Sequence, residues 1–207
     1  MKRKYKYLII LLIIITLIWT LLVVTNQFKV IDKYIYNLLI GLKCDFFTNF
    51  FKVITFFGSV KFIVILNVLA IIYGIVKKNN KCFRIVFFSA CSSFVNSLLK
   101  AIVRRERPDI SLWLVSENNF SFPSGHSMTS FVFYGIICYF IYNSKISLNN
   151  KIVIISLLGL LVILIGMSRI YLGVHYFSDV IGGFLWGFVV LLLGINYLNR
   201  REIEWKH

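Results

Sequence analysis

The sequence predicts an all-α integral membrane protein: a bundle of six transmembrane helices, with amphipathic interfacial helices between the first and second spans. Of the 207 residues, 59% are hydrophobic and 15% are charged, whereas soluble domains contain about 25% charged residues. The formal charge is nevertheless +15, from 23 Lys and Arg against 8 Asp and Glu. This composition excludes a soluble domain, which would expose large apolar patches, and a polar nucleic-acid-binding tail. The length suits one domain over residues 1–207.

Six segments are apolar enough to cross the hydrocarbon core, which takes about 20 residues of helix. The first follows the basic run Lys2-Arg3-Lys4 and precedes no small-residue cleavage site, so we interpret it as a retained signal anchor. Lys100 and Arg104 close the third segment, where they would reach the water boundary. The predicted spans are Tyr7–Thr25, Lys61–Val76, Phe83–Val103, His126–Tyr142, Ile152–Met167 and Val180–Leu198.

The stretch Gln27–Gly58, between the first two spans, carries apolar residues at helical spacing but is interrupted by charges such as Lys29, Asp32 and Lys52. This pattern is typical of one or two amphipathic helices. They would lie in the membrane interface, or they would pack on the bundle as ordinary helices. The sequence leaves both arrangements open.

The distribution of charge predicts a multi-pass cell-membrane protein with both termini in the cytoplasm. With the N-terminus inside, the inner segments hold 13 of the 23 Lys and Arg and two of the eight Asp and Glu. Membrane proteins carry such an excess of Lys and Arg in their cytoplasmic loops. The four cysteines form no CxxC pair, so neither a disulfide framework nor a metal site is indicated.

Two groups of unusual residues then lie on the outer, extracytoplasmic face. The run from Lys100 to Pro108 places four cations within eight positions at the end of a span. Such residues are usually membrane-surface anchors. The run Pro123-Ser-Gly-His126 forms a turn that leads into an apolar helix. Backbone N–H groups near Ser124 and Gly125 would be free to bind an anion there.

A third group on this face contains His175 and Asp179 at i, i+4 spacing. On a helix both side chains would share one face, and the carboxylate would hold the imidazole in a single tautomer. Taken alone, such a pair is often a structural hydrogen bond. Together the three groups supply fixed cations, backbone donors and two imidazoles, which are the groups that phosphoryl transfer requires.

The spacing K-x6-RP, PSGH and SR-x5-H-x3-D is matched by Lys100…Arg107-Pro108, by Pro123 to His126, and by Ser168-Arg169…His175…Asp179. In these motifs, which span residues 100–179, the sequence resembles the membrane-bound type 2 phosphatidic acid phosphatase family. Its wider superfamily includes soluble acid phosphatases and vanadium haloperoxidases. All three motifs match without substitution and in the same order.

The resemblance implies a role for each matching residue. His175 would be the nucleophile, Asp179 would orient it, and His126 would protonate the leaving oxygen and then help to activate water. No metal and no cofactor is implied, because the cations would supply the charge that Mg²⁺ supplies elsewhere. The residues that would hold the phosphate are Lys100, Arg107, Ser124, Gly125 and Arg169.

The function implied is that of a lipid phosphatase, with the bilayer and a membrane lipid phosphate as partners and no nucleic acid. It would remove a terminal phosphate at the outer leaflet through a phosphohistidine. Candidate substrates are undecaprenyl diphosphate, phosphatidylglycerophosphate and phosphatidic acid, and the source is expected to be bacterial. Two alternatives stay open: a non-enzymatic anion-binding or transport protein, and a lipid phosphotransferase with the same site.

Four further charges in these loops are not part of the motifs. Arg104, Arg105 and Glu106 either form surface salt bridges or contact lipid headgroups. Glu117 is interpreted as a solvated loop charge.

Overall fold

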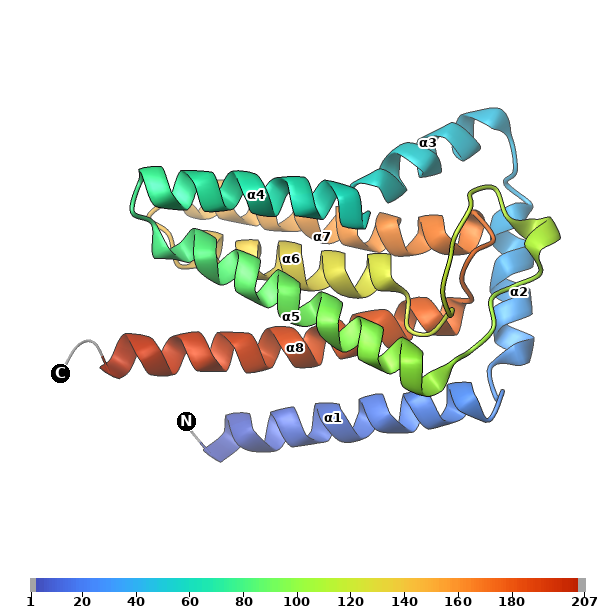
Figure 1. The fold of residues 1–207 in the computed structure, drawn as a ribbon, viewed down its shortest axis with the longest axis horizontal. Helices are drawn as coiled ribbons and strands as arrows, with labels where there is room; N and C mark the ends of the chain where they lie inside the picture. Colours follow the sequence, from blue (N-terminus) through green and yellow to red (C-terminus); the bar gives the residue numbers. More distant parts are fainter. Residues whose placement is uncertain (1–2, 205–207) are drawn as a thin grey trace.

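The computed structural model describes residues 3–204, which form eight α-helices and one 3₁₀ turn. Six helices run lengthwise, and each contains one of the predicted spans apart from Thr25 at the end of the first (Figure 1). The predicted helices are therefore present. The lengthwise helices are α1 (Arg3–Val24), α4 (Val60–Val76), α5 (Asn80–Val103), α6 (Gly125–Tyr142), α7 (Leu148–Tyr171) and α8 (Phe177–Glu204).

Five stretches within the described residues are helical, long enough and apolar enough to cross a membrane. The helix α6 is not among them, and α3 and α4 together form one of the five. The prediction of a multi-span helical membrane protein is confirmed at this level, and the count of six spans stays a prediction. The five stretches are Lys6–Val24, Asp45–Val76, Asn80–Val103, Leu148–Tyr171 and Phe177–Asn199.

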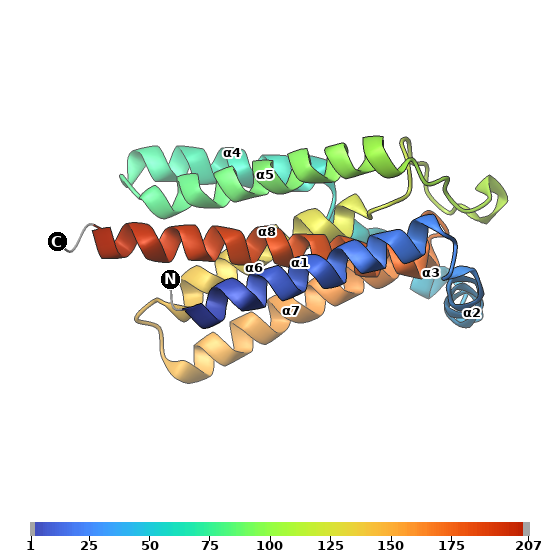
Figure 2. The ribbon, with the colours of Figure 1, turned by 90° about the horizontal axis from the view of Figure 1, so that it is seen from below.

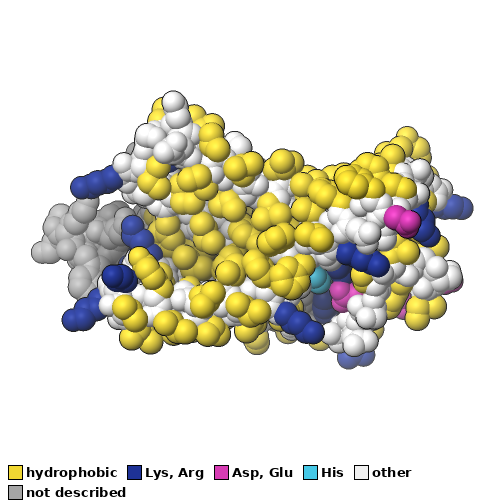
Figure 3. Space-filling model, turned by 90° about the horizontal axis from the view of Figure 1, so that it is seen from above, with side chains coloured by type: hydrophobic (Ala, Val, Ile, Leu, Met, Phe, Trp, Pro, Cys, Tyr) yellow, Lys and Arg dark blue, Asp and Glu magenta, His cyan; other side chains and the backbone are white. Residues whose placement is uncertain are grey.

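The exterior has the character of a membrane protein. Figure 3 shows a broad hydrophobic surface along the bundle, with Lys and Arg gathered toward its two ends. Large apolar side chains of α1 and α4, such as Leu21 and Leu69, are exposed along this length. In water such a surface would drive aggregation, whereas in lipid it needs no cover.

The helix α6 lies at the centre of the bundle and contacts α5, α7 and α8. Its first turns are polar, but Ser127 and Ser130 are fully buried and hydrogen-bonded within the protein. The helix α8 comes close to this polar end because Gly183 has no side chain: a Cβ there would lie 2.8 Å from the Ser124 carbonyl oxygen. Protein, rather than lipid, therefore covers the polar groups of α6.

The stretch 27–58 forms two helices, α2 (Lys29–Ile40) and α3 (Asp45–Phe56). The helix α2 crosses one end of the bundle and α3 packs against α7 (Figure 1). Leu39 of α2 and Phe51 of α3 join one buried cluster with Tyr171. The alternative of packing on the bundle is thus observed, and a location in the membrane interface stays a prediction.

The start of α1 and the end of α8 lie at the end of the bundle opposite α2 (Figures 1 and 2). The first described helix therefore begins, and the last one ends, on the same side of the fold. This arrangement agrees with the predicted placement of both termini on one side of a membrane. Which side that is stays a prediction.

Candidate active site

The three motifs meet at the end of the bundle that α2 covers. Lys100 lies near the C-terminal end of α5, and a long loop that contains the 3₁₀ turn Ile110–Leu112 leads from there to α6. The loop is fixed to the bundle by backbone hydrogen bonds, among them one from Leu114 N to Leu172 O at 3.0 Å. Lys100 and Asp179, which are 79 positions apart, are thereby brought to the same end of the bundle.

The Pro-Ser-Gly-His turn forms the predicted helix start. Ser124 is the N-cap of α6, fully buried, and its hydroxyl accepts hydrogen bonds from the backbone N–H and the hydroxyl of Ser127. A Cβ at Gly125 would lie 3.1 Å from Asn96 Oδ1, so the backbone at Gly125 approaches α5 closely. The first N–H groups of α6 are left without helical acceptors, as expected for an anion site.

His175 and Asp179 lie together, but the prediction that they share one helical face is wrong. His175 precedes α8, in a turn where Gly173 has a φ of +74°. Asp179 lies in the first turn of α8 and accepts a hydrogen bond from the backbone N–H of Tyr176 at 2.9 Å. Its Oδ2 is 3.5 Å from His175 Nδ1. A turn, rather than a helical repeat, therefore brings the pair into contact.

The contacts of His175 define its tautomer. Arg107 Nη1 lies 3.2 Å from His175 Nε2, and a guanidinium can only donate. Nε2 is therefore the acceptor, and the proton is on Nδ1. This N–H faces Asp179 Oδ2 and the Ser121 hydroxyl, which is 3.3 Å away and itself donates to Asp179 Oδ2 at 2.5 Å. Ser121, which the motifs do not include, completes this arrangement.

The electrostatics of the site keep His175 neutral. Its side chain is 2% exposed, and burial lowers its pKa well below the ordinary value. The nearby charges of Arg107, Lys100 and Arg169 lower the pKa further. A neutral imidazole with its lone pair on Nε2 is the form that attacks an electrophile.

We expect His175 to remain unprotonated well below pH 6.5, because its charged form is disfavoured by both burial and neighbouring cations. The measurement is an NMR titration of ¹⁵N-histidine in the purified protein, with the signal assigned through His175→Gln. The spectrum should also show the tautomer with the proton on Nδ1. A titration midpoint at or above pH 6.5 would contradict this electrostatic picture.

Arg107 and Lys100 are fixed by backbone oxygens of the loop and turn. Arg107 donates to Val174 O at 2.7 Å and to Asn119 O at 2.8 Å. Lys100 Nζ donates to the carbonyl oxygens of Phe120 and Ser121. Backbone oxygens thus hold both cations in place, and Arg107 also lies 3.6 Å from the Glu117 carboxylate.

Arg169 is a buried guanidinium with an unused donor. Its side chain is 2% exposed, and its two terminal nitrogens donate to Thr55 Oγ1, at 2.7 Å, and to Glu117 Oε1. Its Nε is buried and has no partner among the described residues. The interpretation of Glu117 as a solvated charge is therefore wrong, because its carboxylate bridges Arg169 and Arg107. It thus contacts two of the cations that are predicted to bind a phosphate.

His126 lies in the first turn of α6, as predicted, and makes no side-chain hydrogen bond within the described residues. It lies within electrostatic range of His175 and of the three predicted phosphate-binding cations, Arg169, Arg107 and Lys100. The structure therefore gathers all eight predicted site residues at this end of the bundle.

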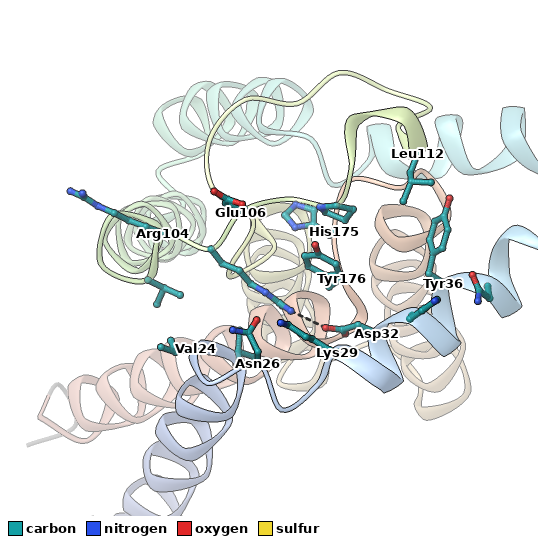
Figure 4. Close-up of a pocket in the computed structure, with 16 residues that line it drawn as sticks. Val24, Asn26, Lys29, Asp32, Tyr36, Arg104, Glu106, Leu112, His175 and Tyr176 are labelled. Atoms are coloured by element: carbon teal, nitrogen blue, oxygen red, sulfur yellow. Dashed lines mark hydrogen bonds and ion pairs between the residues drawn. The ribbon is translucent and has the colours of Figure 1, made fainter.

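An ionic cluster beside the site was not predicted. Asp32 on α2 is buried and pairs with Arg105 at 2.9 Å, and Arg105 also pairs with Asp179 at 2.6 Å. The cluster borders a cavity of about 750 Å³ between α2, the end of α5 and the loop. Figure 4 shows Asp32 pointing from α2 toward the side of this cavity where His175 and Tyr176 lie. The only signal in the sequence was an acidic residue inside an amphipathic pattern.

The chain is similar to known proteins over the region that contains these motifs. The family model described as PAP2 superfamily matches residues 82–203, which include all of the motif residues. Phosphatidylglycerophosphatase B of Bacillus subtilis (strain 168) is 44% identical over 101 residues, which are 48% of this chain and 49% of that protein. The chain thus spans about half the length of the curated relative that it matches in sequence.

Two solved structures are similar in fold. One is the crystal structure of a transmembrane PAP2-type phosphatidylglycerolphosphate phosphatase from Bacillus subtilis, with a TM-score of 0.84 and 29% identity. The similarity covers 93% of this chain and 96% of that one. The other is LpxE of Aquifex aeolicus, with a TM-score of 0.64 and 23% identity over 78% of this chain and 93% of that one. The second supports the fold alone.

Proposed function

Because this chain belongs to the PAP2 superfamily, we propose that it is an integral membrane phosphatase that removes the terminal phosphate of a lipid phosphate. Phosphatidylglycerophosphate is the substrate that we favour, since a sequence relative and a structural relative are both named for it. The lipid tails would stay in the bilayer while the headgroup reaches the α2 end of the bundle. With both termini in the cytoplasm, this end faces the outer leaflet.

In the first step the phosphate would bind between Arg107, Arg169 and Lys100 and displace the Glu117 carboxylate from its bridge. Arg169 offers a buried Nε that has no partner among the described residues, and α6 offers its N-terminal N–H groups at Gly125. Arginine presents a planar fork that matches phosphate oxygens. Fixed cations in a poorly hydrated pocket stabilise the charge that spreads over those oxygens in the transition state.

In the second step His175 Nε2 would attack the phosphorus, and the bond to the leaving lipid oxygen would break. The Nδ1–H of His175 would keep its contact with Asp179, which stabilises the positive charge that develops on the ring. His126 would donate a proton to the leaving oxygen and then accept one from the water that hydrolyses the phosphohistidine. Inorganic phosphate and the lipid alcohol would be the products.

One observation carries this proposal: a neutral imidazole whose Nε2 carries the lone pair and faces Arg107, set among fixed cations, with a carboxylate behind its Nδ1–H. A site that only binds anions needs the cations but not this pair. A phosphotransferase would use the same groups with a different acceptor. The three functions therefore differ in whether the phosphate is only bound, is released to water or is transferred to another acceptor.

We expect purified protein in detergent to release inorganic phosphate from phosphatidylglycerophosphate, and to do so undiminished in a chelator. Phosphatidic acid and undecaprenyl diphosphate, assayed in parallel, would rank the substrates. A strict requirement for Mg²⁺ would contradict the mechanism. Binding without release would favour an anion-binding or transport protein, and phosphate transfer to an added alcohol in place of water would favour a phosphotransferase.

A further inference from the structure

A buried ionic cluster joins α2 to the carboxylate behind His175. Asp32 is 3% exposed, and one of its oxygens accepts a hydrogen bond from the backbone N–H of Ser178 at 2.8 Å. The other accepts from the Ser178 hydroxyl at 2.7 Å and from Arg105 Nη2 at 2.9 Å. Arg105 Nη1 reaches Asp179 Oδ1 at 2.6 Å. None of Asp32, Arg105 and Ser178 belongs to the three motifs.

The position of Arg105 is closely defined. Its guanidinium donates to Asp32, Ser178 and Asp179, and it lies 4.2 Å from the centre of the Tyr176 ring. Burial alone would lower the pKa of Arg105, but Asp179 and Asp32 together raise it above the ordinary value. The side chain therefore remains charged and held between two carboxylates.

The two oxygens of Asp179 have different partners. Oδ1 accepts from Arg105, while Oδ2 accepts from Ser121 and Tyr176 N and faces His175 Nδ1. Arg105 thereby fixes the rotation of the carboxylate. Since Arg105 carries a positive charge 2.6 Å from Asp179, it would also weaken the attraction between Asp179 and a positively charged imidazole. The negative charge of Asp32 on the far side offsets that effect.

We propose that the Asp32–Arg105 pair is a positioning device for the reaction: it sets the orientation of Asp179 and the net charge that Asp179 presents to His175. The helix α2 would thus contribute to catalysis without contacting the phosphate. This inference rests on the proposed function of the same site. The simpler alternative is that the pair only fastens α2 to the bundle.

The two alternatives differ in the pH profile. If the pair only holds α2 against the bundle, either variant would lower activity without moving the pH dependence of kcat/KM in a direction set by the charge removed. A positioning and charge role predicts opposite shifts, because Asp32→Asn removes a negative charge near His175 and Arg105→Gln removes a positive one. The other charged and titratable groups around His175 are Arg107 and Glu117 from the loop, Lys100 from α5, His126 from α6, Arg169 from α7 and Asp179 from α8. They are unchanged in every variant.

The experiment measures kcat, KM and the acidic limb of the pH profile of kcat/KM. That limb reports the pKa values of essential groups in the free enzyme. Asp32→Asn is expected to lower the pKa of His175 and move the limb to lower pH. Arg105→Gln is expected to move it to higher pH, each by roughly half a unit to one unit, on the scale of a neighbouring charge. We expect kcat to fall about tenfold or more with KM little changed, since neither side chain binds phosphate. The double variant should return the limb to near its wild-type position.

Three further variants make the result interpretable. Asp45→Asn, in the exposed first turn of α3, and Arg84→Gln, at the far end of α5, are matched controls and should leave both the limb and kcat unchanged. Arg105→Lys keeps the charge but not the fork, so its limb should stay near the wild-type position while kcat falls. If Arg105→Gln does not fold, the remaining test is the contrast between Asp32→Asn, whose limb should move to lower pH, and Arg105→Lys, whose limb should stay while kcat falls.

Titration of the His175 NMR signal provides the same comparison independently of turnover. Opposite shifts in the two single variants would support the inference. Equal shifts, or none, in active variants would overturn it and leave only a fastening role. Wild-type protein that releases no phosphate from any lipid would overturn the proposed function instead, together with the catalytic part of this inference.

Discussion

Replacing His175 with alanine is expected to abolish phosphate release from lipid phosphates, with a loss of about 10⁶-fold in kcat. This is the scale observed when the nucleophile of a hydrolase is removed. No other described side chain can take its place, because His126 lies on α6 and lacks the carboxylate that His175 has behind its Nδ1. The cations would still bind the phosphate, so KM should change far less than kcat.

Two measurements check this result beside the rate. Wild-type protein quenched in alkali after a brief exposure to ³²P-labelled substrate should carry label, because a phosphohistidine is stable in base and labile in acid. His175→Ala should carry none. His207→Ala, which changes the one histidine outside the motifs, is the matched control and should retain full activity. Phosphate release by His175→Ala at a rate near that of the wild type would refute the phosphohistidine mechanism.

The motifs predicted which residues meet at the site, but not the local geometry of every contact. The meeting of Lys100, Arg107 and His175 at one end of the bundle could be predicted, because the chain has three histidines and the spacing within each motif is specific. The contact between His175 and Asp179 was also predictable, but its geometry was not. A spacing of i, i+4 does not reveal that Gly173 turns the chain before α8 begins.

The partners that connect distant segments could not be predicted from spacing. Asp32 and Arg105 are 73 positions apart, and in the sequence each looked like a surface charge. Glu117 likewise gave no sign that it would bridge two arginines. Burial of a charge depends on which segments meet in the fold, and a single sequence does not supply that information. An isolated buried charge is strongly disfavoured, so each of these charges has a partner of opposite sign.

The helices could be predicted from the sequence, but the way in which they pack against one another could not. Hydropathy located the lengthwise helices, because lipid imposes the same apolar requirement along each of them. It did not show that α6 lies at the centre, where polar residues such as Ser127 are covered by protein. The amphipathic helices α2 and α3 were predictable as elements. Their packing was not, because an apolar face fits a membrane interface and a neighbouring helix equally well.

Replacing Asp179 with asparagine is expected to lower kcat by about 10⁴-fold, the loss known for the corresponding change in a Ser-His-Asp triad. The carboxylate accepts from Arg105, Ser121 and Tyr176 N, and it faces the N–H of His175. An amide has one acceptor oxygen, so its NH₂ group must face one of these donors. If it faces His175, the ring is favoured in the other tautomer, and the proton moves to Nε2, the atom that should attack.

A loss of activity in Asp179→Asn is informative only if the protein remains folded, because Arg105 would then be paired with Asp32 alone. The midpoint of thermal unfolding in detergent is the check on folding. Asp109→Asn, in the exposed part of the loop between α5 and α6, is the control for the chemical change. The NMR spectrum of His175 adds a test of cause, since the variant should lose the tautomer with the proton on Nδ1. A folded variant with wild-type turnover and that tautomer intact would show that the charge of Asp179 is not required. Loss of turnover with the tautomer unchanged would instead assign the effect to lost stabilisation of the charged ring.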